Sequence, residues 1–241
     1  MTTMMDGKRP NSIQVQLYAD GTAEGSAVTL TEVGGWTYTW NNLPEKQNGT
    51  DIVYTVTETG VPTGYTSSTG ENGGTFTITN SYTPETVDIE GTKTWDDASD
   101  QDGKRPASIT VNLLADGTKI DSKTVTAADN WEYKWTGQAK YNNGTLISYT
   151  VTEDTVSDYT AAISGYNIKN TYTPGETSRT AVKVWDDTND QDGKRPTSIQ
   201  VQLKADGADY GSAVTLNAGN NWTYTWSNLP EKSNGVVLQV N

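Results

Sequence analysis

The sequence predicts an all-β protein made of small sandwich domains, and three observations lead to that prediction. Strand-forming Thr, Val, Tyr and Trp are frequent, and apolar residues alternate along short runs such as Ile109, Val111 and Leu113. The 23 glycines separate these runs with turn signals. No long segment shows a helical stripe of apolar residues. The 241 residues are enough for two or three small domains.

The chain repeats itself, and the repeats predict its domain organisation. The phrase Asp-Gly-Lys-Arg-Pro occurs at 6–10 and returns at 102–106 and 192–196. The interval between copies suits one small β domain for each repeat. Only the middle repeat is expected to be whole, since the first has no opening strand and the third ends within a predicted strand. The three predicted domains are 6–84, 87–174 and 179–241.

Each repeat is predicted to contain the same elements in the same order. A Lys-x-Trp strand opens the unit, and an Asp-rich loop closed by Gly and Pro follows. An alternating strand then ends at an Ala-Asp-Gly turn, because Asp and Gly suit a tight hairpin. An aromatic Trp-x-Tyr-x-Trp strand, a Tyr-Thr-Val-Thr-Glu strand and a strand ending in Asn-Ser/Thr-Tyr-Thr-Pro complete the unit. The alternating strands lie at 13–17, 109–113 and 199–203, the aromatic strands at 36–40, 131–135 and 222–226, and the Tyr-Thr-Val-Thr-Glu strands at 54–58 and 149–153.

Composition excludes several classes of function. The net charge of −13 argues against binding to nucleic acid or to an anionic membrane surface. The chain has no histidine, the usual general base and commonest metal ligand, and no cysteine for disulfides or zinc–thiolate sites. No cofactor and no metal site are therefore expected. No signal peptide or membrane span is visible in this chain, which indicates either an internal fragment or export signals that lie outside it.

Three polar residues of the middle repeat stand where apolar residues are expected. Successive side chains of a strand alternate between faces, so Lys93, Glu153 and Asn170 each continue an apolar face of their strand. Such groups are costly to bury unless they meet one another. Two interpretations follow: an ordinary buried ion pair with a hydrogen-bonded asparagine, or attack of a neutral lysine amine on the asparagine carboxamide.

The order of the repeated phrases resembles the Cna protein B-type (CnaB) domain family of Gram-positive surface adhesins and pilins. The resemblance covers nearly the whole chain, and it implies an inverted immunoglobulin-like β-sandwich in each repeat. It also implies a spontaneous intramolecular isopeptide bond that joins Lys93 to Asn170 with Glu153 as the assisting acid. In the first repeat only Glu58 and Asn80 match these positions, and in the third only Lys183 matches.

The expected reaction depends on burial. Burial among Trp95 and its apolar neighbours should lower the pKa of Lys93, because it disfavours the charged amine. The same environment should favour a protonated Glu153, which can donate to the Asn170 carbonyl and carry a proton to the departing ammonia. Each domain would react once, so the protein is not expected to be an enzyme that turns over.

A structural function is therefore expected: a stalk segment of a bacterial adhesin, extracellular and on the cell wall of a Gram-positive bacterium. Its partners would be neighbouring domains of the same surface protein. The alternative is that the repeats themselves bind a host matrix protein or glycan. A further hypothesis is head-to-tail association, in which the Lys183 strand of one chain enters the first repeat of another and meets Glu58 and Asn80.

Three other patterns have competing interpretations. The aromatic strands could be sugar-stacking platforms, but one copy per repeat favours core packing. The Asp-rich loop Asp96, Asp97, Asp100 and Asp102 resembles part of a calcium loop, yet it lacks the full ligand series and a closing glutamate, so a solvated turn is expected. Glycosylation sequons at Asn48, Asn143 and Asn221 are common by chance.

Overall fold

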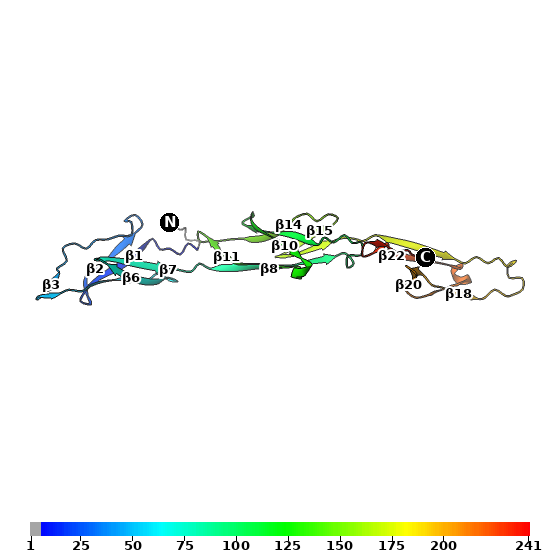
Figure 1. The fold of residues 1–241 in the computed structure, drawn as a ribbon, viewed down its shortest axis with the longest axis horizontal. Coiled ribbons are helices and arrows are strands. Elements are labelled where there is room, and N and C mark those ends of the chain that lie inside the picture. Colours follow the sequence, from blue (N-terminus) through cyan, green and yellow to red (C-terminus); the bar gives the residue numbers. More distant parts are fainter. Residues whose placement is uncertain (1–5) are drawn as a thin grey trace. The chain divides into compact units, whose positions relative to one another are not determined.

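A computed structural model describes residues 6–241 and confirms the all-β prediction (Figure 1). Within these residues, helical structure is confined to two three-residue 3₁₀ turns, Ala127–Asp129 and Ala218–Asn220. No helix in the described range is long and apolar enough to cross a membrane. The chain forms two compact units, one of Met1–Asp88 with Thr136–Ile147 and one of Ile89–Trp135 with Ser148–Asn241.

The first unit holds an antiparallel sheet in the order β2-β1-β5, a separate hairpin of β6 and β7, and two short strand pairs. Val15, Leu17 and Val56 form its core, against which Trp40 and Ile78 pack. The strand bounds are β1 Ser12–Ala19, β2 Thr22–Thr31, β3 Lys46–Gln47, β4 Thr50–Asp51, β5 Tyr54–Thr59, β6 Thr66–Asn72, β7 Thr75–Ser81, β12 Tyr141–Asn142 and β13 Thr145–Leu146.

The predicted aromatic strand of the first repeat does not form: residues 36–40 lie in a turn and extended chain with no strand pairing. Its counterpart in the middle repeat, β11 (Glu132–Ala139), pairs with the opening strand β8 (Thr86–Asp96). The described part of the first repeat supplies no equivalent of β8. A strand without a neighbour cannot satisfy its backbone groups in a ladder, so the alternation of 36–40 alone does not make a strand.

The middle repeat is a two-layer sandwich. One sheet has the order β10-β9-β14 and is antiparallel, while the other has the order β11-β8-β16-β15. In the second sheet the first and last strand-forming motifs lie side by side, since β8 and β16 pair in parallel. Apolar residues from both inner faces fill the space between the layers. The remaining bounds are β9 Ser108–Ala115, β10 Thr118–Thr126, β14 Tyr149–Glu153, β15 Thr160–Ser164 and β16 Asn167–Thr171.

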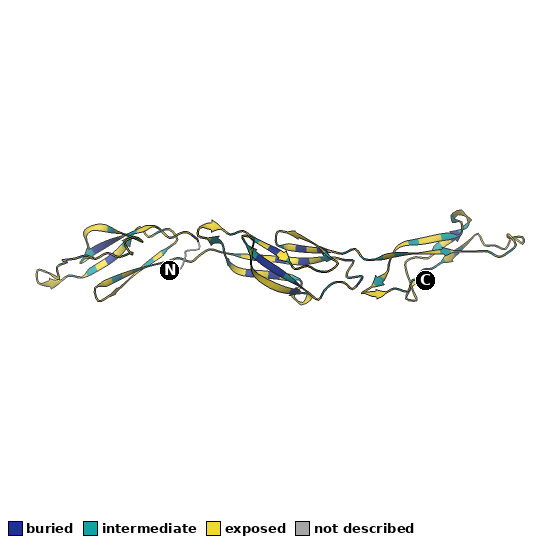
Figure 2. Cartoon of the chain, turned by 90° about the horizontal axis from the view of Figure 1, so that it is seen from above, coloured by how far each residue is buried: buried dark blue, intermediate teal, exposed yellow. Residues whose placement is uncertain are grey.

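Burial is concentrated in this sandwich, as the dark segments of Figure 2 show. Its core residues are Ile89, Ile109, Val111, Leu113, Val125, Tyr133, Trp135, Val151 and Ile168. Along β8, β11, β14 and β16 the core residues alternate with more exposed ones, which is the pattern on which the strand predictions rested. β9 is an exception, since Asn112 between Val111 and Leu113 is buried as well.

The third repeat, in the second unit, pairs β17 with β22 and β18 with β21, and has two further short pairs. Its buried core is small and consists of Leu203, Leu216 and Leu229. The bounds are β17 Glu176–Val182, β18 Ser198–Val201, β19 Lys204–Ala205, β20 Ala208–Asp209, β21 Val214–Asn217, β22 Thr223–Pro230, β23 Lys232–Ser233 and β24 Val236–Val237.

Candidate functional site

The three inward polar residues of the middle repeat lie together between its two sheets. Lys93 is on β8 and Asn170 on the adjacent β16, where Asn170 is opposite Trp95 in the parallel ladder. Trp95 is two residues after Lys93, so Lys93 and Asn170 share one face of the sheet. Glu153 ends β14 in the facing sheet. The ion-pair distance between Lys93 Nζ and Glu153 Oε1 is 2.9 Å.

This cluster is shielded from water. The Lys93 and Glu153 side chains are 0% and 2% exposed, and Asn170 is completely buried. Although Lys93 Nζ and Glu153 Oε1 are close, neither atom takes part in an aligned hydrogen bond. The amide nitrogen and oxygen of Asn170 also have no hydrogen-bond partner. The ion pair compensates Lys93 and Glu153 in part, but the two amide atoms of Asn170 have no partner at all, which is unusual because burial without hydrogen bonds is costly.

The surroundings favour an uncharged amine at Lys93. Burial lowers the pKa of Lys93, and this effect outweighs the neighbouring Glu153 carboxylate, which acts in the opposite direction. The Nζ atom is 4.3 Å from the centre of the Trp95 ring. A neutral lysine amine is a nucleophile, whereas the ammonium ion is not.

Close strand packing positions the lysine. Gly91 precedes Lys93 by two residues on the same face of β8, and a Cβ atom at this position would collide with the carbonyl group of Tyr166. The Tyr133 hydroxyl donates a hydrogen bond to the same carbonyl oxygen. A glycine here therefore lets β8 approach the chain that leads into β16.

The partial sites of the outer repeats differ from the middle one. In the first repeat, Asn80 Nδ2 donates to Glu58 Oε1 at 2.9 Å, and Ser67 Oγ donates to Glu58 Oε2 at 2.7 Å. Asn80 Oδ1 is buried without a hydrogen-bond partner. Lys183 of the third repeat is half-buried, with Nζ 4.4 Å from the centre of the Trp185 ring. Its association with Glu58 and Asn80 of another chain stays a prediction.

The expectation of a solvated Asp-rich loop is wrong for Asp97 and Asp102, which are buried. Both oxygens of Asp97 accept hydrogen bonds from Arg105, at 2.6 and 3.0 Å, and Asp97 Oδ2 also accepts one from the Tyr159 hydroxyl. Burial raises the pKa of Asp97, but these hydrogen bonds and the Arg105 charge outweigh it, so its pKa is lowered. The recurrence of the Asp–Arg spacing in the third repeat was the available signal.

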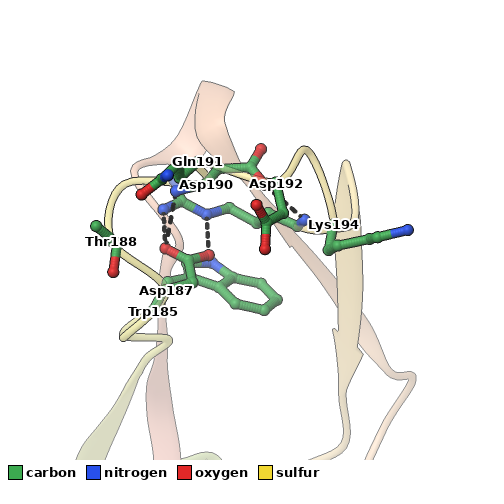
Figure 3. Close-up of a pocket in the computed structure, with 8 residues that line it drawn as sticks. Trp185, Asp187, Thr188, Asp190, Gln191, Asp192 and Lys194 are labelled. Atoms are coloured by element: carbon green, nitrogen blue, oxygen red, sulfur yellow. Dashed lines mark hydrogen bonds and ion pairs between the residues drawn. The ribbon is translucent and has the colours of Figure 1, made fainter.

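The same loop in the third repeat is more open. Figure 3 shows the Asp187 carboxylate above the Trp185 ring, with dashed lines marking its bonds to Arg195. In the middle repeat the Tyr159 ring covers the equivalent Trp95, with ring centroids 5.0 Å apart. At the corresponding place in the third repeat there is a hollow lined by Trp185 and Asp187.

The aromatic strands are core elements where both sheets are present. Tyr133 and Trp135 are 5% and 4% exposed, which confirms core packing in the middle repeat. The equivalents Tyr38 and Tyr224 are 53% and 41% exposed, so core packing is wrong for these two side chains. In the middle repeat, Tyr133 packs against Gly91 of β8 and hydrogen-bonds to the Tyr166 carbonyl in the chain before β16.

Comparison with known proteins places the repeats in a family. The model of the Cna protein B-type domain matches residues 2–81, 89–171 and 179–239. A collagen adhesin of Staphylococcus aureus is 52% identical over 235 residues, which are 97% of this chain and 20% of that protein. The chain thus spans about a fifth of the length of this curated relative.

A solved structure of two repeat units agrees with this assignment. The crystal structure of two B repeat units of the collagen binding protein of S. aureus matches with a TM-score of 0.67 and 50% identity, over 98% of this chain and 64% of that one. A single B repeat unit of the collagen binding surface protein of S. aureus is 52% identical over 65% of this chain and 84% of that one, with a TM-score of 0.37.

Proposed function

Because this chain belongs to the Cna protein B-type domain family, we propose that it is a structural stalk segment of a bacterial cell-surface adhesin, stabilised by a covalent Lys93–Asn170 cross-link. The segment would lie outside the cell, on the cell wall, and hold other parts of the adhesin away from it. The observation that carries the proposal is the dry cluster of Lys93, Glu153 and Asn170 between the sheets.

The proposed reaction is an amide exchange. The Lys93 amine attacks the side-chain carbonyl carbon of Asn170, and a C–N bond forms between Nζ and that carbon. The Asn170 C–N bond breaks, and the amide nitrogen leaves as ammonia with the proton that the amine has lost. Glu153 is the group placed to carry this proton, and its carboxyl can donate to the carbonyl oxygen as negative charge develops there.

The geometry supplies most of the rate advantage in this proposal. Neighbouring strands hold the amine and the amide on one face, so a bimolecular reaction becomes an intramolecular one. Effective molarities of well-oriented groups reach on the order of 10⁵ M. The reaction occurs once for each chain, and no external substrate is required.

An unreacted ion pair explains the cluster less well. Buried ion pairs are tolerated when their remaining hydrogen bonds are satisfied. Here the Asn170 amide has no hydrogen-bond partner at either end, and burial disfavours the charged form of Lys93 despite the Glu153 carboxylate. An amide linkage would remove the lysine charge and use the asparagine carbon, which relieves both problems.

The cross-link would give the segment mechanical strength. β8 opens the middle repeat and β16 closes it, so a bond between them bears force applied along the chain. By analogy with disulfides, closing a loop of this length stabilises the fold by roughly 4 kcal/mol, because it restricts the unfolded chain. The absence of cysteine agrees with a protein that is stabilised by another covalent bond.

Intact-mass measurement of the purified chain tests the cross-link. The proposal expects a mass one ammonia below that of the sequence. Lys93→Ala should restore the uncondensed mass expected for its own sequence, whereas Lys183→Ala should still lack one ammonia. A parent chain with its full sequence mass would eliminate the cross-link.

Direct binding to a host matrix protein or glycan is the second candidate function, favoured by the exposed rings of Tyr38 and Tyr224. Both named relatives are described as binding collagen or as a collagen adhesin. Immobilised collagen offered to the full chain, with Tyr38→Ala and Tyr224→Ala as comparisons, tests this. Saturable binding that weakens in these variants would support direct binding. Equally weak binding by all three proteins would show that these two rings are not the binding surface.

A further inference from the structure

One contact occurs twice in the chain, each time between the Asp-Gly of one repeat and an Asn-Gly turn of the next. In the first unit, Gly7 lies against Gly144, and in the second unit, Gly103 lies against Gly235. A Cβ atom added to Gly7 or Gly103 would be 2.8 Å from the Cα atom of its partner glycine. All four glycines have positive φ, which favours glycine, and at Gly7, Gly103 and Gly235 the close approach disfavours any side chain as well.

The aspartates that precede Gly7 and Gly103 accept hydrogen bonds from the linker that follows their own repeat. Asp6 Oδ2 accepts hydrogen bonds from the Tyr82 hydroxyl at 2.7 Å and from the Glu85 amide at 2.8 Å. The Glu85 carbonyl then accepts a bond from the Lys140 amide, and the Lys140 ammonium pairs with the Glu85 carboxylate at 2.7 Å. These hydrogen bonds therefore connect the aspartate to the linker, and the linker to the following repeat.

The second copy repeats the pattern with other residues. Asp102 Oδ2 accepts from the Tyr172 hydroxyl at 2.8 Å and from the Gly175 amide at 3.1 Å. The Gly175 carbonyl accepts from the Glu231 amide, and the Gly235 amide donates to the Gln101 carbonyl at 3.0 Å. Asp102 is buried, and the bonds from Gly175 and Tyr172 outweigh the effect of burial, so its pKa is lowered.

We propose that these contacts form a docking joint between consecutive repeats. Its seat is the Asp-Gly pair with the linker that the aspartate holds, and its insert is the Asn-Gly turn of the following repeat. The joint restrains the hinge that a flexible linker would otherwise provide. The partner that binds the Asp-Gly seat is another repeat of the same type, because each repeat carries the Asn-Gly turn at the equivalent position of its sequence.

The chain also contains one Asp-Gly seat and one Asn-Gly turn that make no such contact, and these serve as an internal comparison. Gly193 repeats the Asp-Gly seat in the third repeat, and Gly49 repeats the Asn-Gly turn in the first. A Cβ atom at either position would meet nothing within 4 Å, although both residues have positive φ. Asp192 is exposed, whereas Asp6 and Asp102 are buried in their joints. The seat at Asp192 and Gly193 thus offers the same groups to the turn of a further repeat.

The contact is small and polar, so it acts through tethering. The short linker keeps seat and insert close together, which raises their effective concentration without any additional contact. A weak contact can then remain formed within one chain while being too weak to join separate chains. The joint is therefore a property of consecutive repeats, not a dimer interface.

A spin-label distance measurement on the full chain tests the joint between the second and third repeats. The chain has no cysteine, so Lys119→Cys and Ser212→Cys provide two defined labelling sites on exposed positions. The parent chain should give one narrow distance distribution. Gly103→Ala should broaden it at least two-fold, because the added methyl group prevents the approach of Gly235.

Gly193→Ala is the matched control, since it introduces alanine at a similar positive φ but into open space. It should leave the distribution narrow. Gly235→Ala and its open counterpart Gly49→Ala repeat the comparison from the other side of the joint, in case one variant fails to fold. A broad distribution in the parent chain, or equal distributions in both members of each pair, would overturn the proposal.

Discussion

At the scale of single residues, Lys93 shows how burial turns a surface residue type into a reactive one. A lysine in water is an ammonium ion, and its pKa falls only when water is excluded. Here the amine is enclosed by both sheets and by the Trp95 ring. Its charged partner is Glu153, which the facing sheet supplies. Residues far apart in the sequence are thus brought within reaction distance by the fold.

Replacement of the acid tests its assigned role. Glu153→Gln keeps the shape of the side chain but removes the proton carrier, so the cross-link should not form. The variant should have the full mass of its own sequence, because no ammonia is lost. Its free energy of unfolding should be lower by roughly 4 kcal/mol, the contribution expected from closing a loop of this length. Glu58→Gln is the control, because its repeat has no matching lysine, and it should still condense. A Glu153→Gln chain that condenses fully would remove the acid from the mechanism.

The alkaline limit of stability is a second prediction at this scale. Burial, with a smaller contribution from the Glu153 charge, raises the pKa of Tyr133 from 10.0 to about 12. Because the folded pKa is raised, the stabilisation is complete below about pH 10 and is lost as the pH rises toward 12. Tyr82 and Tyr159 also have raised pKa values, so tyrosinate absorbance should show several late-titrating groups, of which Tyr133→Phe should remove one. Identical titration curves for the two proteins would contradict this.

At the scale of elements, alternation predicted the strands of the middle repeat, but it also predicted a strand at 36–40 that does not form. Alternation gives the two faces of a segment, and a ladder also needs a neighbouring strand: β8 is that neighbour for β11 and β17 for β22, whereas residues 36–40 pair with no strand. The Asp-rich loop was misjudged for a related reason. Its carboxylates look solvated until Arg105 and Tyr159, which are distant in the sequence, cover Asp97.

The importance of burial in the Asp97 loop can be tested by comparison with the equivalent Asp187 loop of the third repeat. Arg105→Ala leaves a carboxylate whose side chain is 1% exposed without its main partner, and should cost about 1–3 kcal/mol of unfolding free energy. Arg195→Ala should cost less, because the Asp187 side chain is 29% exposed and water can replace the arginine. Denaturant unfolding of both variants provides the comparison. A larger loss in Arg195→Ala would contradict the assigned importance of burial.

At the scale of the whole molecule, the candidate cross-link residues were predictable because three polar positions interrupted apolar faces, and the structure brings all three together. The joints between repeats were not predictable in this way. Gly103 and Gly235 are ordinary turn residues in the sequence, and only the folded chain brings them into contact.

Association between chains is the prediction that belongs to this scale. β7 pairs only with β6, and β17 only with β22, among the strands of the described chain. If β17 of one chain, with Lys183 directly after it, enters the first repeat of another, concentrated protein should form oligomers that survive boiling in SDS. Lys183→Ala should abolish them, and Lys194→Ala, which changes an exposed loop lysine, should not. Monomer alone at high concentration would contradict the hypothesis.

The central claim is a bond between two named side chains, and peptide mapping by tandem mass spectrometry tests it most directly. Protease digestion of the folded chain should release a branched peptide in which Lys93 is joined to Asn170 with the loss of one ammonia. Separate, unmodified peptides that contain Lys93 and Asn170, with no branched product, would contradict the account.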